Sequence, residues 1–135
     1  MLNIVVGVFF VLHGLVHLLY FGHSWRIFEL TPGLTWPDQS WAFAKLLGDQ
    51  TTRMLASAAL ILAAAGFAAG GAAIFLKQSW WQPAVVGSAA FSSVLYLLFW
   101  DGEMQKLSDK GWVGILINLA ILGAVLLLRW PKFDF

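Results

Sequence analysis

Long apolar runs, separated by polar stretches, make up most of this sequence. The runs lie at about residues 2–21, 54–76, 83–100 and 112–128. The first two reach the roughly 20 residues that a helix rising 1.5 Å per residue needs to cross the hydrocarbon core of a bilayer. The last two contain no charged side chain, but they reach that length only if the Trp and Gly residues at their ends are counted. This pattern predicts four membrane-spanning segments.

Each segment must be helical, because lipid offers no hydrogen-bond partner to an open backbone. The connections at residues 77–82 and 101–112 are short, which favours antiparallel neighbours, whereas residues 22–53 form a long connection. We therefore expect an all-α membrane protein, with four transmembrane helices in an up-and-down antiparallel bundle that forms one domain over residues 1–135. An even number of spans places both termini on the same side.

The long connection contains the stretch "TWPDQSWAFAKLLGD", which has the signals of a short helix. Pro37 suits a first helical turn and Gly48 suits a stop. On a helix the aromatic and leucine side chains would share one face, with the charged Asp38 and Lys45 roughly opposite. We predict an amphipathic helix at about residues 37–47, lying on the membrane surface. An ordinary capping loop is the alternative.

The composition agrees with a lipid environment. Hydrophobic residues make up 60% of the 135 residues, charged residues only 11%, and the mean hydropathy is +0.78. A soluble domain of this size could not bury so much apolar surface. The net charge of +1 argues against nucleic-acid binding, and the lack of cysteine excludes disulfides, Fe–S clusters and thiolate zinc sites. Many of the eight tryptophans lie at the ends of the apolar runs, as expected at a membrane interface.

The expected location is a bacterial-type inner (plasma) membrane. The first apolar segment lacks the basic start and the A-x-A site of a signal peptide, so we expect it to be retained. The orientation is less clearly marked, because five Lys or Arg residues lie on the side of the long connection and three on the side of the termini. That count alone would make the side of the long connection cytoplasmic, but two of its five basic residues lie deep in that connection. The terminal side has almost no acidic residues, and we expect cytoplasmic termini. Its three basic residues are Lys77, Arg129 and Lys132.

Small residues recur at helical spacing in the last three segments. Gly66 and Gly70 form a GxxxG pair in the second, and the others are Ala84, Ser88 and Ser92 in the third and Gly114, Asn118 and Gly123 in the fourth. Helices in lipid associate through such close-packing faces. These faces are expected to hold the bundle together, or to contact a neighbouring subunit.

All three histidines lie within or just after the first apolar segment, in "FVLHGLVHLLYFGHSW". At about 100° per residue, His13, His17, Tyr20 and Ser24 fall on one stripe of the helix. Such a stripe must face protein, a cofactor or water, because lipid cannot satisfy it. The candidate cofactor-binding residues are therefore His13, His17 and Tyr20, together with Asn118 from the fourth segment.

The confinement of the histidines to one segment limits what they can bind. A six-coordinate haem needs an axial histidine from each of two helices, which only a homodimer could supply. A haem or chlorin held by a single histidine remains open, as does a quinone along the His13/His17 face. The two residues could also share one metal ion, or form hydrogen bonds with Asn118, Ser92 or Tyr96 across the bundle.

A second candidate site lies where the spans meet the long connection. His23, Asp101 and Glu103 would gather there and could form a metal or proton site. The alternative is an interfacial ion pair between Arg53 and Asp101, which would contribute little.

The stretch "VGVFFVLHGLVHLLYFG" (residues 6–22) resembles the first span of DoxX-like four-helix membrane proteins. The later "LLFW" (residues 97–100) and "GILINLAIL" (residues 114–122) are similar to stretches of other small four-span bacterial proteins. The resemblance implies a four-helix bundle and a quinone- or haem-associated partner, since some DoxX-like proteins are small subunits of quinone-linked oxidoreductases. Only His13 and Gly14 match that pattern, and His17 stands where it often has Lys.

Motifs for nucleophilic catalysis, nucleotide binding or metallohydrolysis are absent from the sequence. We therefore expect a small non-catalytic accessory subunit of a larger membrane complex. It would contact the bilayer and other membrane subunits, or copies of itself, and would not bind nucleic acid. The alternatives are a DoxX-like redox-linked protein with a haem, quinone or metal site, and a small transporter or lipid-binding protein.

Overall fold

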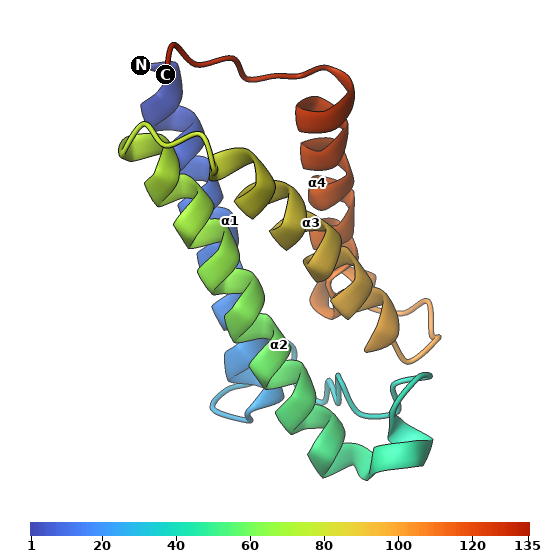
Figure 1. Ribbon diagram of the computed structural model, residues 1–135. Coiled ribbons are helices and arrows are strands. Elements are labelled where there is room, and N and C mark those ends of the chain that lie inside the picture. Colours follow the sequence, from blue (N-terminus) through green and yellow to red (C-terminus); the bar gives the residue numbers. More distant parts are fainter.

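The computed structural model describes residues 1–135 and consists of helices joined by loops. Figure 1 shows the four α-helices, and the third of them is followed by a short 3₁₀-helix at Leu107–Lys110. A π-helical turn at Gly123–Leu127 directly continues the last α-helix. The α-helices are α1 (Leu2–Ser24), α2 (Ala44–Phe75), α3 (Trp81–Leu98) and α4 (Trp112–Leu122).

All four apolar runs of the sequence are thus helical. Three of the helices, α1, α2 and α3, are long and apolar enough to cross a membrane, whereas the apolar stretch Trp112–Leu127 is shorter. The largest difference from the prediction is at the start of α2, which begins at Ala44 and not near residue 54. Its first four residues are separated from the rest by Gly48, whose φ of 77° interrupts the helical backbone.

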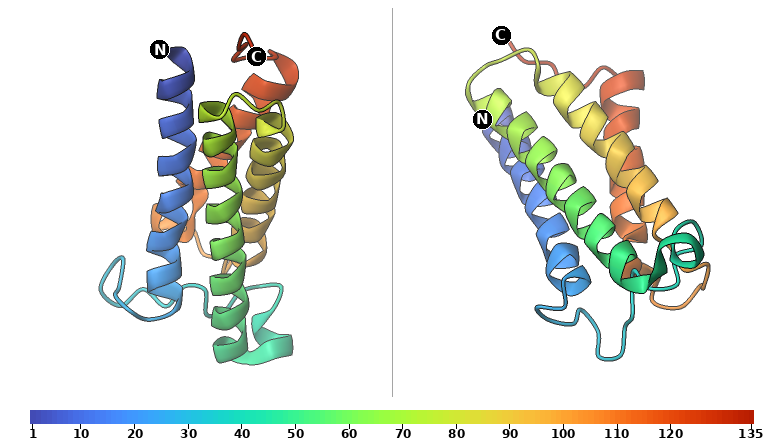
Figure 2. Two further views of the ribbon diagram at one scale, coloured as in Figure 1. Left: turned by 60° about the vertical axis from the view of Figure 1, so that its left-hand side comes forward. Right: turned by 60° about the horizontal axis from the view of Figure 1, so that its bottom comes forward.

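Consecutive helices run in opposite directions, and both termini lie at one end of the molecule (Figure 1). The packing follows the chain order, with α1 against α2, α2 against α3, and α3 against α4. The backbones of α1 and α4, by contrast, scarcely touch. Figure 2 shows this order from two further sides. We call the end that carries the termini the terminal end, and the opposite end, with residues 25–43, the loop end.

Glycines allow α1 and α2 to approach closely. A Cβ atom added to Gly14 would lie 2.9 Å from the carbonyl oxygen of Ala64, and one added to Gly71 would lie 2.7 Å from the carbonyl oxygen of Gly7. Real Cβ atoms essentially never approach other atoms so closely. The backbones of these two helices can therefore pack at this distance only because both positions lack a side chain.

The GxxxG pair of the second apolar run contacts α3 of the same chain. A Cβ atom on Gly66 would collide with the hydroxyl of Ser88, and one on Gly70 would lie 2.5 Å from Cγ2 of Val85. These glycines are thus used inside the molecule and not at a subunit contact. Gly123 differs from the expectation, since nothing lies within 4 Å of the Cβ it would carry.

The interior consists of two apolar clusters, one toward each end. The cluster at the terminal end includes Phe10, Phe67, Ile74, Trp81 and Val85. The cluster at the loop end includes Trp36, Leu60, Ala63, Tyr96 and Phe99. Along α1, α3 and α4, the residues between the two clusters are polar and buried, and they form the candidate site described below.

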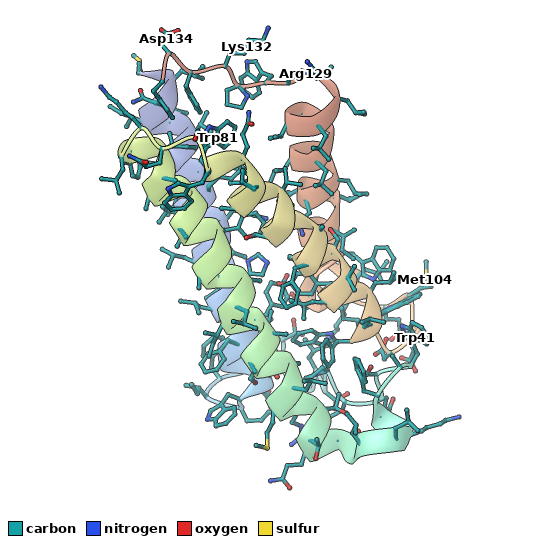
Figure 3. All side chains as sticks on the ribbon, viewed as in Figure 1. Trp41, Trp81, Met104, Arg129, Lys132 and Asp134 are labelled. Atoms are coloured by element: carbon teal, nitrogen blue, oxygen red, sulfur yellow. The ribbon has the colours of Figure 1, made fainter.

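The predicted surface helix at residues 37–47 is wrong for most of its length. Residues 37–43 form turns, and helical structure begins only at Ala44. Hydrogen bonds attach this segment to the end of α3, from the Ser40 hydroxyl to the Leu98 carbonyl (2.6 Å) and from the Trp41 indole to the Leu97 carbonyl (2.7 Å). Figure 3 shows Trp41 at this end of α3. The segment therefore packs on the loop end of the helices.

Asp38, expected on a solvent-facing surface, is only 8% exposed. Its carboxylate accepts hydrogen bonds from Arg26 (3.2 Å) and from Nε of Arg53 (2.5 Å), and it forms a second contact with the Arg53 guanidinium. Arg53 therefore pairs with Asp38 and not with Asp101. Arg26 also donates to the carbonyls of residues 23, 35 and 36. Burial lowers the pKa of the Arg26 guanidinium, and the Asp38 carboxylate counteracts that shift.

Replacing Asp38 with Ala is expected to loosen the loop end. Breaking a buried ion pair costs several kcal/mol, but the two guanidinium side chains are 29% and 34% exposed, which reduces the expected loss to about 1–2 kcal/mol. Hydrogen exchange should therefore accelerate in residues 25–43 more than in the helices. Glu103→Ala removes the same charge at the same end, where the Glu103 side chain makes no hydrogen bond, and should leave exchange unchanged. Equal exchange rates in both variants would contradict the expectation that the ion pairs of Asp38 stabilise residues 25–43.

Candidate functional site

Four polar side chains from three helices meet in the middle of the molecule, between the two apolar clusters. They are His13 and His17 of α1, Ser92 of α3 and Asn118 of α4, and all four are buried. His13 Nε2 lies 2.8 Å from Asn118 Oδ1, Asn118 Nδ2 lies 2.9 Å from Ser92 Oγ, and Ser92 Oγ lies 2.6 Å from His17 Nε2. His17 Nδ1 closes the ring at 2.9 Å from the backbone carbonyl of His13. We call these four residues the polar ring.

The hydrogen bonds of the polar ring can run in only one direction when both histidines are neutral. The His13 carbonyl only accepts, so His17 Nδ1 carries its proton and His17 Nε2 is an acceptor. Ser92 must then donate to His17 and can only accept from the Asn118 amide group, so Asn118 Oδ1 accepts from His13 Nε2. A flipped Asn118 amide would require the Ser92 hydroxyl to donate twice. The two histidines therefore have opposite tautomers.

Aromatic rings enclose the polar ring. Phe67 of α2 packs against both imidazoles, with ring centroids 4.7 Å from His13 and 5.4 Å from His17. Tyr96 lies 5.7 Å from His17, and Phe9 stacks on His13 at 5.9 Å. No charged side chain bonds to the ring. Except at His13 Nδ1, its imidazole nitrogens are satisfied by other groups of the ring, which is the arrangement that a low-dielectric interior favours.

The structure brings together three of the four predicted cofactor-binding residues, namely His13, His17 and Asn118. The fourth, Tyr20, is not part of the polar ring, because its hydroxyl donates to the Ser108 carbonyl (2.6 Å) in the connection before α4. Ser92 completes the ring in its place. The sequence offered Ser92, beside Asn118 and Tyr96, as a hydrogen-bond partner of the histidines, but its place in the small-residue pattern of the third run indicates close packing as readily.

Three of the four imidazole nitrogens in the polar ring are not free to ligate the metal of a tetrapyrrole. Both nitrogens of His17 and Nε2 of His13 already have hydrogen-bond partners, so a metal could take any of them only if the ring opened. Neither histidine lines the pockets at the terminal end, the hollows between α2 and α3, or the groove between α1 and α4. Of the four uses left open by the sequence, the geometry shows the hydrogen bonds across the bundle. His13 Nδ1 is the one imidazole nitrogen of the ring without a partner.

The predicted metal site at His23, Asp101 and Glu103 is wrong. The structure contains no group of three or more His, Cys, Asp or Glu side chains placed to hold a metal ion. His23 is fully buried beside Trp36, and its Nδ1 accepts from the backbone N–H of Leu30 (3.1 Å). Asp101 instead forms an ion pair with Lys110 at 2.9 Å. The folded loop at residues 25–43 gives His23 its own partners.

Two polar features at the loop end were not expected from the sequence. Lys110 is only 3% exposed and depends on Asp101 to compensate its buried charge. The N–H groups of His23 Nε2, Trp36 Nε1 and Trp112 Nε1 are buried without an acceptor. Sequence patterns identify lysine and tryptophan as interfacial residues, and they do not show which of them a loop will cover.

The protein thus consists of helices, three of them long and apolar enough to cross a membrane, and hydrogen bonds between interior polar groups connect these helices. Comparison with known proteins adds no family to this description. The chain matches no protein-family model, no curated protein and no solved structure.

Proposed function

We propose that this protein is a non-catalytic accessory subunit of a larger membrane complex, with all four helices spanning a bacterial-type inner membrane and both termini on the cytoplasmic side. In this arrangement α4 and its π-helical continuation, residues 112–127, form the fourth span of an up-and-down antiparallel bundle. Their 16 residues are short for a bilayer, and local thinning or snorkelling of Arg129 would accommodate them.

The polar ring is the observation that supports a structural role. Intramembrane polar residues usually mark a substrate or ion pathway, because their burial is costly. Here His17, Ser92 and Asn118 bond to one another and join α1, α3 and α4. These groups therefore contribute to helix association, and a function in the membrane would depend on the outer surfaces of the helices.

An apolar groove between α2 and α3 offers a surface for a partner helix. Two adjoining hollows, each of about 310 Å³, share Leu62 and Phe91 and run along the outside of these helices. Gly87 lies in the groove, is exposed, and has nothing within 4 Å of the position of a Cβ atom. Small residues at such positions allow a transmembrane helix of another subunit to approach closely.

The test is purification of the full chain from its native membrane in mild detergent. We expect a stoichiometric partner, recovered again when the partner is tagged. Gly87→Leu should lower its recovery by on the order of tenfold, because the new side chain fills the groove. Gly123→Leu is the matched control, since that glycine also has free space around it. A protein recovered alone, or equal losses in both variants, would contradict the proposal.

An absorption spectrum of the same preparation tests the redox-linked alternative. A haem or chlorin band that disappears in His13→Ala or His17→Ala would overturn the accessory function in its present form. His13 Nδ1, which has no hydrogen-bond partner, would then be the available metal ligand, whereas His17 could serve only if the polar ring opened.

A further inference from the structure

A second apolar groove lies between α1 and α4, whose backbones scarcely touch. It has a volume of about 510 Å³, and ten of its eleven lining residues are hydrophobic. Val5 and Phe9 line it from α1, Ile117 and Ala120 from α4, and Trp130 from the C-terminal tail. Phe9 is 43% exposed although it faces the space between two helices. The groove is therefore open toward the surrounding lipid.

Basic side chains lie directly beyond the terminal end of this groove. Pro131 lines the groove and also a neighbouring polar pocket of about 400 Å³, to which Arg129 and Lys132 belong. Lys132 lines a third pocket of about 350 Å³ together with Lys77. Figure 3 shows Arg129 and Lys132 along the tail that runs from α4 back toward the N-terminus. Asp134 is the one acidic side chain that lines these pockets.

These cations differ from three of the five at the loop end, where only Lys45 and Lys106 are likewise unpaired. Arg26, Arg53 and Lys110 all form ion pairs within the chain. Lys77, Arg129 and Lys132 form none, and their side chains donate no hydrogen bond. Three basic residues with one acid, next to an apolar groove, leave a positive charge that the protein itself does not compensate.

We propose that the α1–α4 groove and its basic rim bind one anionic phospholipid. An acyl chain lies along the groove, and the phosphate lies between Arg129 and Lys132. Unpaired cations near a membrane surface attract anionic headgroups, each by about 1 kcal/mol. Basic pockets between helices at the cytoplasmic side are a recognised type of lipid site. The proposal needs no partner subunit and so goes beyond the accessory function.

The dimensions suit this ligand. The groove follows α4 from Ile117 to Val125, which at 1.5 Å per residue is about 12 Å along the helix. This is close to the depth of one leaflet of a hydrocarbon core about 30 Å thick. Its volume also falls within the range of roughly 300–1,000 Å³ that small-ligand sites have. One chain can therefore enter the groove from the headgroup region without reaching the opposite leaflet.

The experiment measures lipid retained by the purified full chain. The protein is equilibrated with detergent micelles containing equal amounts of dioleoyl phosphatidylglycerol and dioleoyl phosphatidylcholine, and bound lipid is counted by native mass spectrometry. We expect the wild-type protein to retain the anionic lipid preferentially. The double variant Arg129→Gln/Lys132→Gln should lose this preference by on the order of tenfold, given the contribution of each cation. Ala120→Trp, which fills the groove, should reduce retention of both lipids.

Matched controls decide between a site and general attraction. Lys45→Gln/Lys106→Gln removes the same charge from unpaired lysines at the loop end and should leave the preference unchanged. Leu116→Trp places the same indole on an exposed part of α4 outside the groove and should not affect retention. The proposal is overturned if the two double variants lose the preference equally, or if Ala120→Trp retains lipid as the wild type does. Displacement of the lipid by millimolar inorganic phosphate would likewise overturn it, because it would show an anion site without a bound chain. If Ala120→Trp fails to fold, Ala124→Leu makes the same test with less added volume.

Discussion

Asn118→Leu is expected to lower the free energy of unfolding by about 2 kcal/mol. The substitution keeps the volume of the side chain but removes two hydrogen bonds, leaving the N–H of His13 Nε2 without an acceptor inside the bundle. Hydrogen bonds between membrane helices contribute about 0.6 kcal/mol on average and up to about 1.7 kcal/mol, and an unsatisfied buried donor adds to that loss. Reversible unfolding in mixed micelles measures the difference.

Leu119→Ala is the control on the same helix, because Leu119 is exposed on the outer face. It should change stability by no more than about 0.5 kcal/mol.

The nitrogen chemical shifts of the two imidazoles supply a second readout, which a loss of packing alone would not change. In the wild type, His13 should be protonated at Nε2 and His17 at Nδ1, and in Asn118→Leu the His13 tautomer should become mixed. Identical tautomers in the wild type would contradict the polar ring.

Gly71→Ala should destabilise the protein by about 1–3 kcal/mol, although alanine is the better helix former. The new methyl group would lie 2.7 Å from both the Gly7 carbonyl oxygen and Cγ2 of Val11. Because a backbone oxygen cannot rotate away as the end of a side chain can, α1 and α2 must move apart. The measurement is again the free energy of unfolding in micelles.

Gly87→Ala makes the same chemical change on α3, where nothing lies within 4 Å of the added atom. It should be neutral or stabilise the helix by up to about 1 kcal/mol. A Gly71→Ala variant that is as stable as Gly87→Ala would show that α1 and α2 are not held at the described distance.

The sequence predicted the helices well, because long uncharged runs have few alternatives to a helix in lipid. It also indicated that His13, His17 and Asn118 lie in one site, since polar residues within such runs have to find partners. Which partner each one takes depends on helix rotation, and apolar runs with hydrophobic residues on every side do not specify rotation. The bond from His17 to Ser92, and the separate contact of Tyr20 with Ser108, could therefore not be chosen in advance.

The loop end was predicted less well, for a different physical reason. The surface helix at residues 37–47 was inferred from local spacing, which treats Asp38 as a solvent-facing residue. The folded loop brings Arg26 and Arg53 to that carboxylate across 12 and 15 residues of sequence. Tertiary ion pairs of this kind override a weak local preference.

The direction of the hydrogen bonds in the polar ring has a consequence for how the helices align. Apolar helices in a bilayer can slide along one another at little cost, because each new neighbour is as apolar as the last. Moving α4 by one turn, about 5.4 Å, would replace Asn118 with Gly114 or Leu122 opposite His13. Neither side chain can both accept from an imidazole and donate to a hydroxyl. A single backbone carbonyl, that of His13, thus fixes two tautomers and one amide orientation, and through them the vertical register of three helices.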